Sequence, residues 1–151
     1  APYIIETGTL NHAACSGVSA AIDFISSLGQ GSTYREKLES AYLQISDHEF
    51  SLAKHLYESL EGFDKTTVIG PDFSTRKRTP TVSFVHSEYS PQEVCALLAK
   101  QNICAWDGHF YALKAIQQLG LESRGGVTRL GISLYNTRKE IDKVIEVIKS
   151  I

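Results

Sequence analysis

Hydrophobic residues recur at helical spacing in three long stretches of the chain. The first, at about 11–28, predicts a helix rich in small residues, which Gly29 would follow as its C′ residue. The second, at about 33–60, carries one apolar stripe over roughly seven turns and predicts a long helix. The third predicts a final amphipathic helix, whose apolar residues follow the i, i+3, i+4, i+7 pattern: Ile141, Val144, Ile145 and Ile148.

Shorter β-branched or alternating segments lie between the second and third of these helices. They predict strands at about 67–69, 79–85, 103–106 and 126–134. Capping boxes at Ser90 and Thr137 mark two helix starts, and a short helix is expected at 110–119. The order β-β-α-β-α-β-α predicts an α+β fold, in which helices cover one side of a small antiparallel or mixed sheet and a long connecting helix precedes it.

A short flexible break at Gly29-Gln30-Gly31-Ser32 is a candidate domain boundary. We therefore expect two parts, with residues 1–31 as the remnant of a larger domain and residues 32–151 as a small C-terminal domain. The chain has no methionine, which indicates either a processed N-terminus or a part of a longer protein.

Composition narrows the possible partners. The 151 residues are 42% hydrophobic and 21% charged, with a formal net charge of −2. This balance gives no electrostatic case for binding nucleic acid or an anionic membrane. The longest uncharged stretch, 7–22, holds Asn, His, Ser and Gly, so no transmembrane span is expected.

The three cysteines, Cys15, Cys95 and Cys104, are odd in number and widely spaced. This favours a reduced, cytoplasmic compartment over a disulfide framework. Cys104 and His109 are the nearest approach to a metal pair, and we expect no metal site. The cysteines are interpreted as buried apolar residues.

Gly8 and Thr9 precede the first helix, where free backbone N–H groups and a hydroxyl can bind an anion. The alternative is a plain helix cap, in which Thr9 or Asn11 satisfies the helix end and nothing binds.

A second candidate is Trp106-Asp-Gly-His-Phe-Tyr111, which lies between a predicted strand and a predicted helix. Its Gly108-His109 suits a binding loop. Alternatively, Asp107 caps the next helix and the aromatic residues fill the core.

The third candidate is Arg129, which lies inside an otherwise neutral strand. Its forked guanidinium suits a carboxylate, so it either binds a ligand or forms a structural ion pair with an acidic residue.

Taken together, these stretches resemble known enzymes. Glu6-Thr-Gly-Thr-x-Asn11 is similar to a late large-domain segment of class V aminotransferases. Their small domain, especially in the cysteine desulfurase-like branch, resembles three further segments: Arg78-Thr-Pro-Thr-Val-Ser-Phe84, Trp106 to Tyr111, and Arg129-Leu-Gly-Ile-Ser-Leu-Tyr-Asn-Thr137.

The resemblance implies a pyridoxal phosphate enzyme of the aspartate aminotransferase fold that acts on an amino acid as a homodimer. Gly8 and Thr9 would bind the cofactor phosphate of the neighbouring subunit. Arg129 would bind the substrate carboxylate, and His109 would lie at the substrate.

Two departures qualify this resemblance. All lysines follow Gly31, so none matches the upstream Schiff-base lysine of the family, and Tyr111 stands in the loop where true desulfurases carry a cysteine. The resemblance thus predicts the C-terminal part of such an enzyme, inactive alone. The alternatives are a stand-alone α+β module that binds an amino acid, and a dimerisation piece without a ligand.

Overall fold

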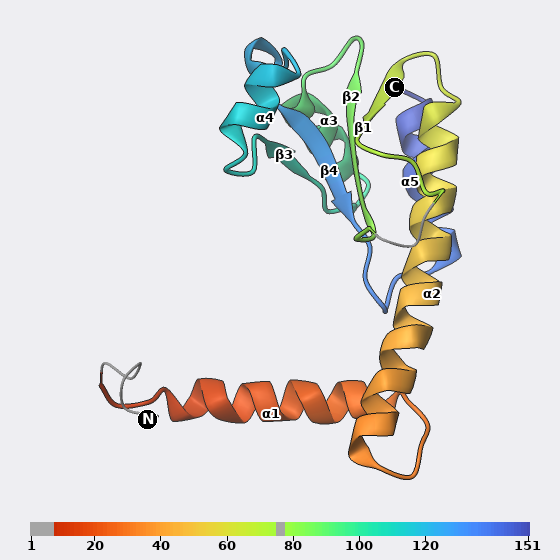
Figure 1. Cartoon of the computed structure of the whole chain (residues 1–151). Helices are drawn as coiled ribbons and strands as arrows, with labels where there is room; N and C mark the ends of the chain where they lie inside the picture. The colour runs from red at the N-terminus through yellow and green to blue at the C-terminus, as the bar shows by residue number, and fades with distance from the viewer. Residues whose placement is uncertain (1–7, 75–77) are drawn as a thin grey trace. The chain divides into compact units, whose positions relative to one another are not determined.

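A computed structural model describes residues 8–74 and 78–151. The chain divides into two compact units, residues 1–47 and 48–151 (Figure 1). The long helix α2, Tyr34–Glu61, contributes its first part to one unit and its second part to the other. The domain boundary that the sequence suggests after residue 31 stays a prediction.

The first unit contains helix α1, His12–Ser27, and the start of α2, as the apolar spacing predicts. The Asn11 side chain caps α1, since its Oδ1 accepts a hydrogen bond from the Ala14 N–H at 3.0 Å. The turn between the helices needs glycine, because a Cβ on Gly29 would lie 1.8 Å from the Lys37 carbonyl oxygen. Close backbone approach therefore explains this glycine.

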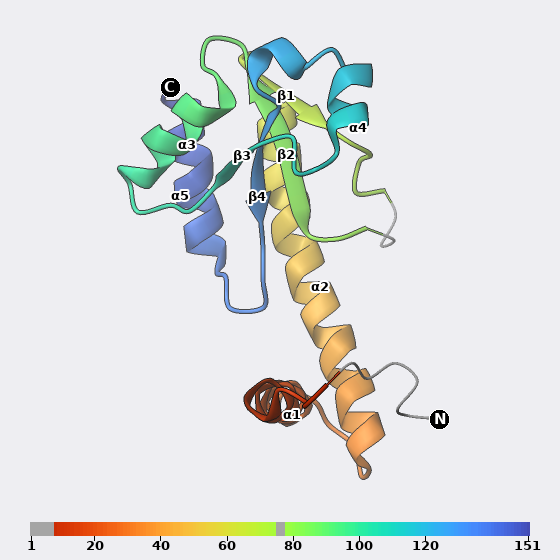
Figure 2. The same cartoon turned by 90° about the vertical axis from the view of Figure 1, so that its left-hand side faces the viewer.

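The second unit is an α+β domain with four strands and helices packed on its sheet (Figure 2). Its elements are β1 Thr66–Ile69, β2 Thr81–His86, α3 Pro91–Ala99, β3 Trp106–Gly108, α4 Leu113–Gln118, the 3-10 helix Glu122–Arg124, β4 Val127–Gly131 and α5 Arg138–Lys149. The strand order is β1-β2-β4-β3, and every neighbouring pair is antiparallel. The predicted α+β class is confirmed, and the sheet is antiparallel rather than mixed.

The core lies on one face of this sheet. Along β2, buried Val82 and Phe84 alternate with half-buried Ser83, and in β4 Thr128 and Leu130 are buried on the same face. The helices that cover them contribute Leu52, Leu56, Leu60, Val94, Leu98, Ile141, Val144 and Ile148. Both predicted capping boxes are present, at Ser90 for α3 and at Thr137 for α5.

Two predicted elements are displaced around β3. The expected strand at 103–106 is found at Trp106–Gly108, and the helix expected at 110–119 begins only at Leu113. Phe110 and Tyr111 have φ of 51° and 59°, which an α-helix does not accommodate. The segment between β3 and α4 is thus a loop with its own backbone conformation.

His86, in β2, is a buried residue with a titratable imidazole. It is 1% exposed, and its Nδ1 accepts hydrogen bonds from the Glu88 and Tyr89 N–H groups at 3.2 and 3.3 Å. Its Nε2 is buried without a hydrogen-bond partner among the residues that the structure describes. Burial, together with the positive charge of Lys65, lowers the pKa of His86, although Glu88 opposes this change.

We expect the free energy of unfolding to fall when the pH drops from 7 to 5. The folded chain holds His86 neutral at a lowered pKa, so the unfolded chain binds more protons in this range. The contribution is present above the unfolded pKa and is lost as the pH falls through the folded value. Urea unfolding at several pH values measures it, and His86→Asn, which keeps an acceptor for both amides, should flatten the dependence. An unchanged slope in this variant would exclude His86 as its source.

Candidate functional site

Arg129 lies in the middle of β4 on the face opposite the core. Its side chain is exposed, whereas its chain neighbours Thr128 and Leu130 are buried. The antiparallel register places Ser83 of β2 on one side of Arg129 and Trp106 of β3 on the other. Three side chains thus form a row across the open face of the sheet.

The guanidinium group of Arg129 is held by an aromatic ring. Its Cζ lies 3.8 Å from the centroid of the Phe110 ring, which is a close cation–π contact. Within 8–74 and 78–151 it has no ion pair or hydrogen bond, so the alternative of a structural ion pair is not supported. All its N–H donors are available to a carboxylate.

The loop that supplies Phe110 has an unusual backbone. Gly108, Phe110 and Tyr111 all have positive φ, and such conformations in residues other than glycine cost on the order of 1–3 kcal/mol each. His109 stabilises the loop, since its Nδ1 accepts a hydrogen bond from the Tyr111 N–H at 3.1 Å. His109 is exposed and lies next to the residue that contacts Arg129.

The alternative role of Asp107 as a helix cap is wrong. Asp107 lies within β3, where it pairs with Thr128, and α4 begins after Ala112 without any side-chain cap. The aromatic residues of this segment do not fill the core either, since Trp106 is 71% exposed and Tyr111 is fully exposed.

An open pocket of about 390 Å³ lies beside Arg129, and Thr81, Cys104, Ala105, Trp106, Arg129 and Gly131 line it. Thr81 and Gly131 were not predicted as site residues, and Phe110 was not predicted as the partner of Arg129. Strand alternation could have identified Gly131, because it is two residues from Arg129 and faces the same side of the sheet. This pocket joins the predicted Arg129 to the segment that contains His109.

The exposure of the cysteines differs from the prediction. Cys15 and Cys104 are exposed and Cys95 is half-buried, so the interpretation as buried apolar residues is wrong. Burial, with the nearby Asp107 carboxylate, raises the pKa of the Cys95 thiol to about 11, which makes it a poor nucleophile. Cys104 precedes β3 and lines the pocket.

Gly8 and Thr9 lie in the first unit, just before α1, and both are exposed. Asn11 provides the side-chain cap of this helix, so the Thr9 hydroxyl is not used for capping. Glu6 and Thr7 of the same motif lie outside the described residues. The structure thus brings Arg129 and the His109 loop together, and Gly8 and Thr9 belong to the other unit.

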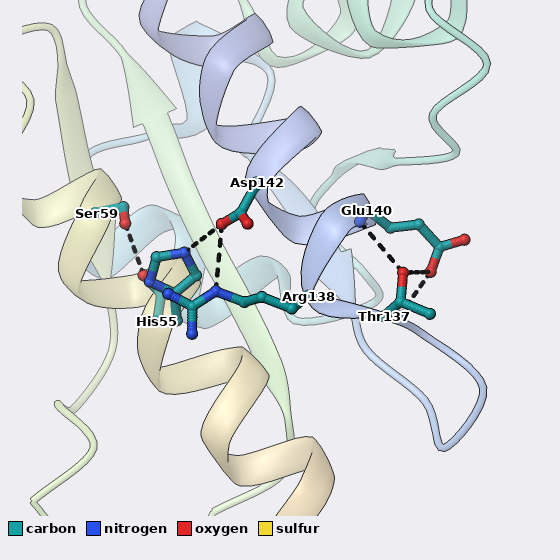
Figure 3. Close-up of polar contacts among 6 residues, drawn as sticks. All are labelled: His55, Ser59, Thr137, Arg138, Glu140 and Asp142. Atoms are coloured by element: carbon teal, nitrogen blue, oxygen red, sulfur yellow. Dashed lines mark hydrogen bonds and ion pairs between the residues drawn. The ribbon is translucent and has the colours of Figure 1, made fainter.

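A polar cluster on α2 and α5 has residues of the types found in hydrolases, but it lacks their arrangement (Figure 3). His55 Nε2 lies 2.7 Å from Asp142 Oδ1, whereas the Ser59 hydroxyl donates to the His55 backbone carbonyl and not to its ring. Hydrogen bonds from His55 and then Arg138 lower the pKa of Asp142. Without a serine on the ring, this cluster joins two helices and is not a catalytic triad.

A second cavity, of about 440 Å³, borders α5 and the segment after α3. Its charged residues already have partners: Glu140 belongs to the capping box, and Lys143 Nζ donates to the Gln101 carbonyl at 2.6 Å. In the described part of the chain, no group of three His, Cys, Asp or Glu residues could hold a metal ion. The open pocket at Arg129 is therefore the best candidate site.

Comparison with solved structures defines the class of protein. The fold matches a cysteine desulfurase from Escherichia coli with a TM-score of 0.75 and 21% identity, over 99% of this chain and 33% of that one. It matches the apo cysteine desulfurase from Thermococcus onnurineus with a TM-score of 0.68 and 26% identity, over 78% of this chain and 28% of that one. The fold is that of pyridoxal phosphate enzymes of this type.

The sequence matches the aminotransferase class V family over residues 1–144, and the chain belongs to this family. It is 28% identical to a cysteine desulfurase from Serratia proteamaculans, over 95% of this chain and 31% of that protein. It is 27% identical to a probable cysteine desulfurase from Methanothermobacter thermautotrophicus, over 99% of this chain and 34% of that protein. The chain thus spans about a third of the length of these relatives.

The predicted family is confirmed, and its members depend on pyridoxal phosphate. None of the helices in the described residues is long and apolar enough to cross a membrane. The roles predicted for Gly8, Thr9, His109 and Arg129 stay predictions.

Proposed function

We propose that this chain is the C-terminal part of a pyridoxal phosphate-dependent class V enzyme and that Arg129 binds the carboxylate of its amino-acid substrate. The observation that carries the proposal is the guanidinium of Arg129, which is exposed beside a pocket, stacked on Phe110 and unpaired with any described acid. Such an arginine matches a carboxylate with two parallel hydrogen bonds.

The other residues have supporting roles in this proposal. Phe110 holds the guanidinium plane, and His109 holds the loop that carries Phe110 and faces the substrate. Gly8 and Thr9 bind the cofactor phosphate of the neighbouring subunit. This role fits a hydroxyl that is not used as the cap of the helix that follows it.

Pyridoxal phosphate supplies an electron sink for the substrate when it is bound. All lysines of this chain follow Gly31, and the family's Schiff-base lysine lies upstream of the Glu6 motif, so we expect the chain alone to be inactive. We further propose a cytoplasmic homodimer, with residues 1–31 belonging to the large domain. Apolar side chains exposed on α1 support an association through this helix: Val18, Ile22 and Phe24.

A second candidate is a stand-alone module that binds an amino acid without catalysis. It is favoured by the second unit, which has a complete sheet and its own hydrophobic core. Pyridoxal phosphate added to the chain tests the expectation, common to both candidates, that the chain alone is inactive. A stable lysine-linked absorbance band with turnover of an amino acid would contradict both.

Arg129→Gln is expected to weaken the binding of L-amino acids about 10- to 100-fold. Hydrogen bonds to a charged group contribute roughly 1.5–3 kcal/mol, and about 1.4 kcal/mol corresponds to a factor of ten. Trp106 is the only tryptophan of the chain and lies beside Arg129 on the neighbouring strand β3. Its fluorescence therefore reports the titration.

Two controls accompany this titration. Lys139→Gln removes a positive charge from the exposed surface of α5 and should leave the affinity unchanged. Amino-acid methyl esters lack the carboxylate and should bind the original chain as weakly as L-amino acids bind Arg129→Gln. Equal affinities of the original chain and Arg129→Gln would contradict the role of Arg129.

A further inference from the structure

The pocket beside Arg129 has a floor without a side chain. Gly131 lies opposite Thr81 in the β2–β4 register, and it is two residues from Arg129 on the same face of β4. A Cβ built on Gly131 would meet no atom within 4 Å, and its φ is not positive. The hollow therefore exists because a side chain is missing there, and not because the backbone needs glycine.

The walls of this hollow come from three strands or their extensions. Trp106 pairs with Arg129, and Cys104 precedes it by two residues, so both lie toward the same face of the sheet and line the pocket. Cys104 is exposed, which leaves its thiol accessible from solvent. The hollow over Gly131 is thus bordered by a hydroxyl, a thiol, an indole and a guanidinium.

Among these groups only Arg129 carries a charge. A ligand that places its carboxylate on Arg129 would bring the rest of its structure over Gly131, against neutral walls. A second charge there would lose water without gaining a partner, which costs free energy. The pocket thus discriminates against charged side chains, because it offers no partner for a second charge.

We infer that the hollow over Gly131, between Trp106 and Cys104, is the subsite for the side chain of the carboxylate ligand, and that it selects an uncharged side chain that contacts the Cys104 thiol. The inference takes only one element from the proposed function, which is the binding of a carboxylate by Arg129. The subsite itself depends on Gly131 and Cys104, which the proposed function does not require.

Alkylation of the cysteines tests this arrangement in the chain itself. The Cys104 thiol first loses its proton to solvent. The thiolate then displaces iodide from iodoacetate, so that an S–C bond forms as the C–I bond breaks. Iodoacetamide reacts in the same way but has no carboxylate. Exposed Cys15 on α1 is the internal reference for intrinsic reactivity. Peptide mass spectrometry should show an iodoacetate-to-iodoacetamide rate ratio about tenfold higher at Cys104 than at Cys15.

Matched variants separate the charge from the cavity. Arg129→Gln should lower the ratio at Cys104 to that of Cys15, whereas Lys139→Gln should leave it unchanged. Gly131→Val should slow the reaction of Cys104 with both reagents, because its side chain fills the hollow. Gly131→Ala, with a smaller side chain, should give a weaker effect in the same direction. Equal ratios at both cysteines, or unchanged Cys104 rates in both Gly131 variants, would overturn the inference.

Protection by amino acids tests the selectivity. L-valine should slow the reaction of iodoacetamide with Cys104, whereas L-aspartate and L-lysine at the same concentration should not. Equal protection by all three would overturn the neutral subsite and leave the carboxylate role of Arg129 intact. If the fluorescence titration gave equal affinities for the original chain and Arg129→Gln, this result would instead contradict the proposed function.

Discussion

Gly126→Ala is expected to lower the free energy of unfolding by about 2–4 kcal/mol, whereas Gly125→Ala should lower it by about 1 kcal/mol. Both glycines have positive φ, of 98° and 83°, so both substitutions carry the cost of a left-handed backbone in alanine. Only Gly126 also faces a clash, because its Cβ would lie 2.2 Å from the Gly108 carbonyl oxygen. Overpacking against backbone adds about 1–3 kcal/mol to the conformational cost.

The clash lies where β3 and β4 meet. Gly108 pairs with Val127, the residue that follows Gly126, so relief of the clash must move the end of β3 away from β4. Urea unfolding followed by circular dichroism measures both variants, and Gly125→Ala is the matched control because nothing lies within 4 Å of its Cβ. Equal losses in the two variants would show that backbone conformation, and not close approach, requires Gly126.

The same substitution should also affect the site. Movement of β3 would displace Trp106 from its place opposite Arg129 and would disturb the loop that brings Phe110 to the guanidinium. We therefore expect Gly126→Ala, under conditions where it is folded, to show altered Trp106 fluorescence. Gly125→Ala should keep the original spectrum.

Phe84→Ala is expected to lower the free energy of unfolding by about 3–5 kcal/mol. Phe84 lies in β2, one of the two inner strands of the sheet, is 0% exposed and belongs to the core cluster with residues of α2, α3 and α5. Removal of its ring leaves a cavity, since the helices can collapse only partly into the space. Urea unfolding measures the loss.

Neighbouring Ser83 provides the control for Phe84. It lies on the opposite face of the same strand and is half-buried, so Ser83→Ala should change the stability by less than about 0.5 kcal/mol. Phe84→Leu, which keeps much of the volume, should be intermediate. A small effect of Phe84→Ala would indicate that the helices are not packed on the sheet as described.

The fold was largely predictable because its signals are local. The capping boxes at Ser90 and Thr137 depend on residues three positions apart, and both helices begin where these boxes predict. The shift of the strand expected at 103–106 has a different cause. The strand forms where Trp106 to Gly108 pair with β4, and this pairing depends on residues about twenty positions away.

The candidate site was predictable only in part. Arg129 was identified because a charge in a neutral strand needs a partner, but its partner is the ring of Phe110 and not an acid. That contact depends on a left-handed backbone at Phe110 and Tyr111, and neither residue type favours this conformation. The helix predicted at 110–119 therefore begins only at Leu113, because tertiary structure holds residues 110–112 as a loop.

The stacking of Arg129 on Phe110 also has an entropic consequence. A free arginine side chain has roughly 2 kcal/mol of rotamer entropy, and a ligand that immobilises such a side chain loses affinity by a comparable amount. In this chain the guanidinium is already restricted by the ring before a ligand arrives. The rotational freedom of Arg129 is thus given up when the chain folds, so a carboxylate meets a preorganised receptor.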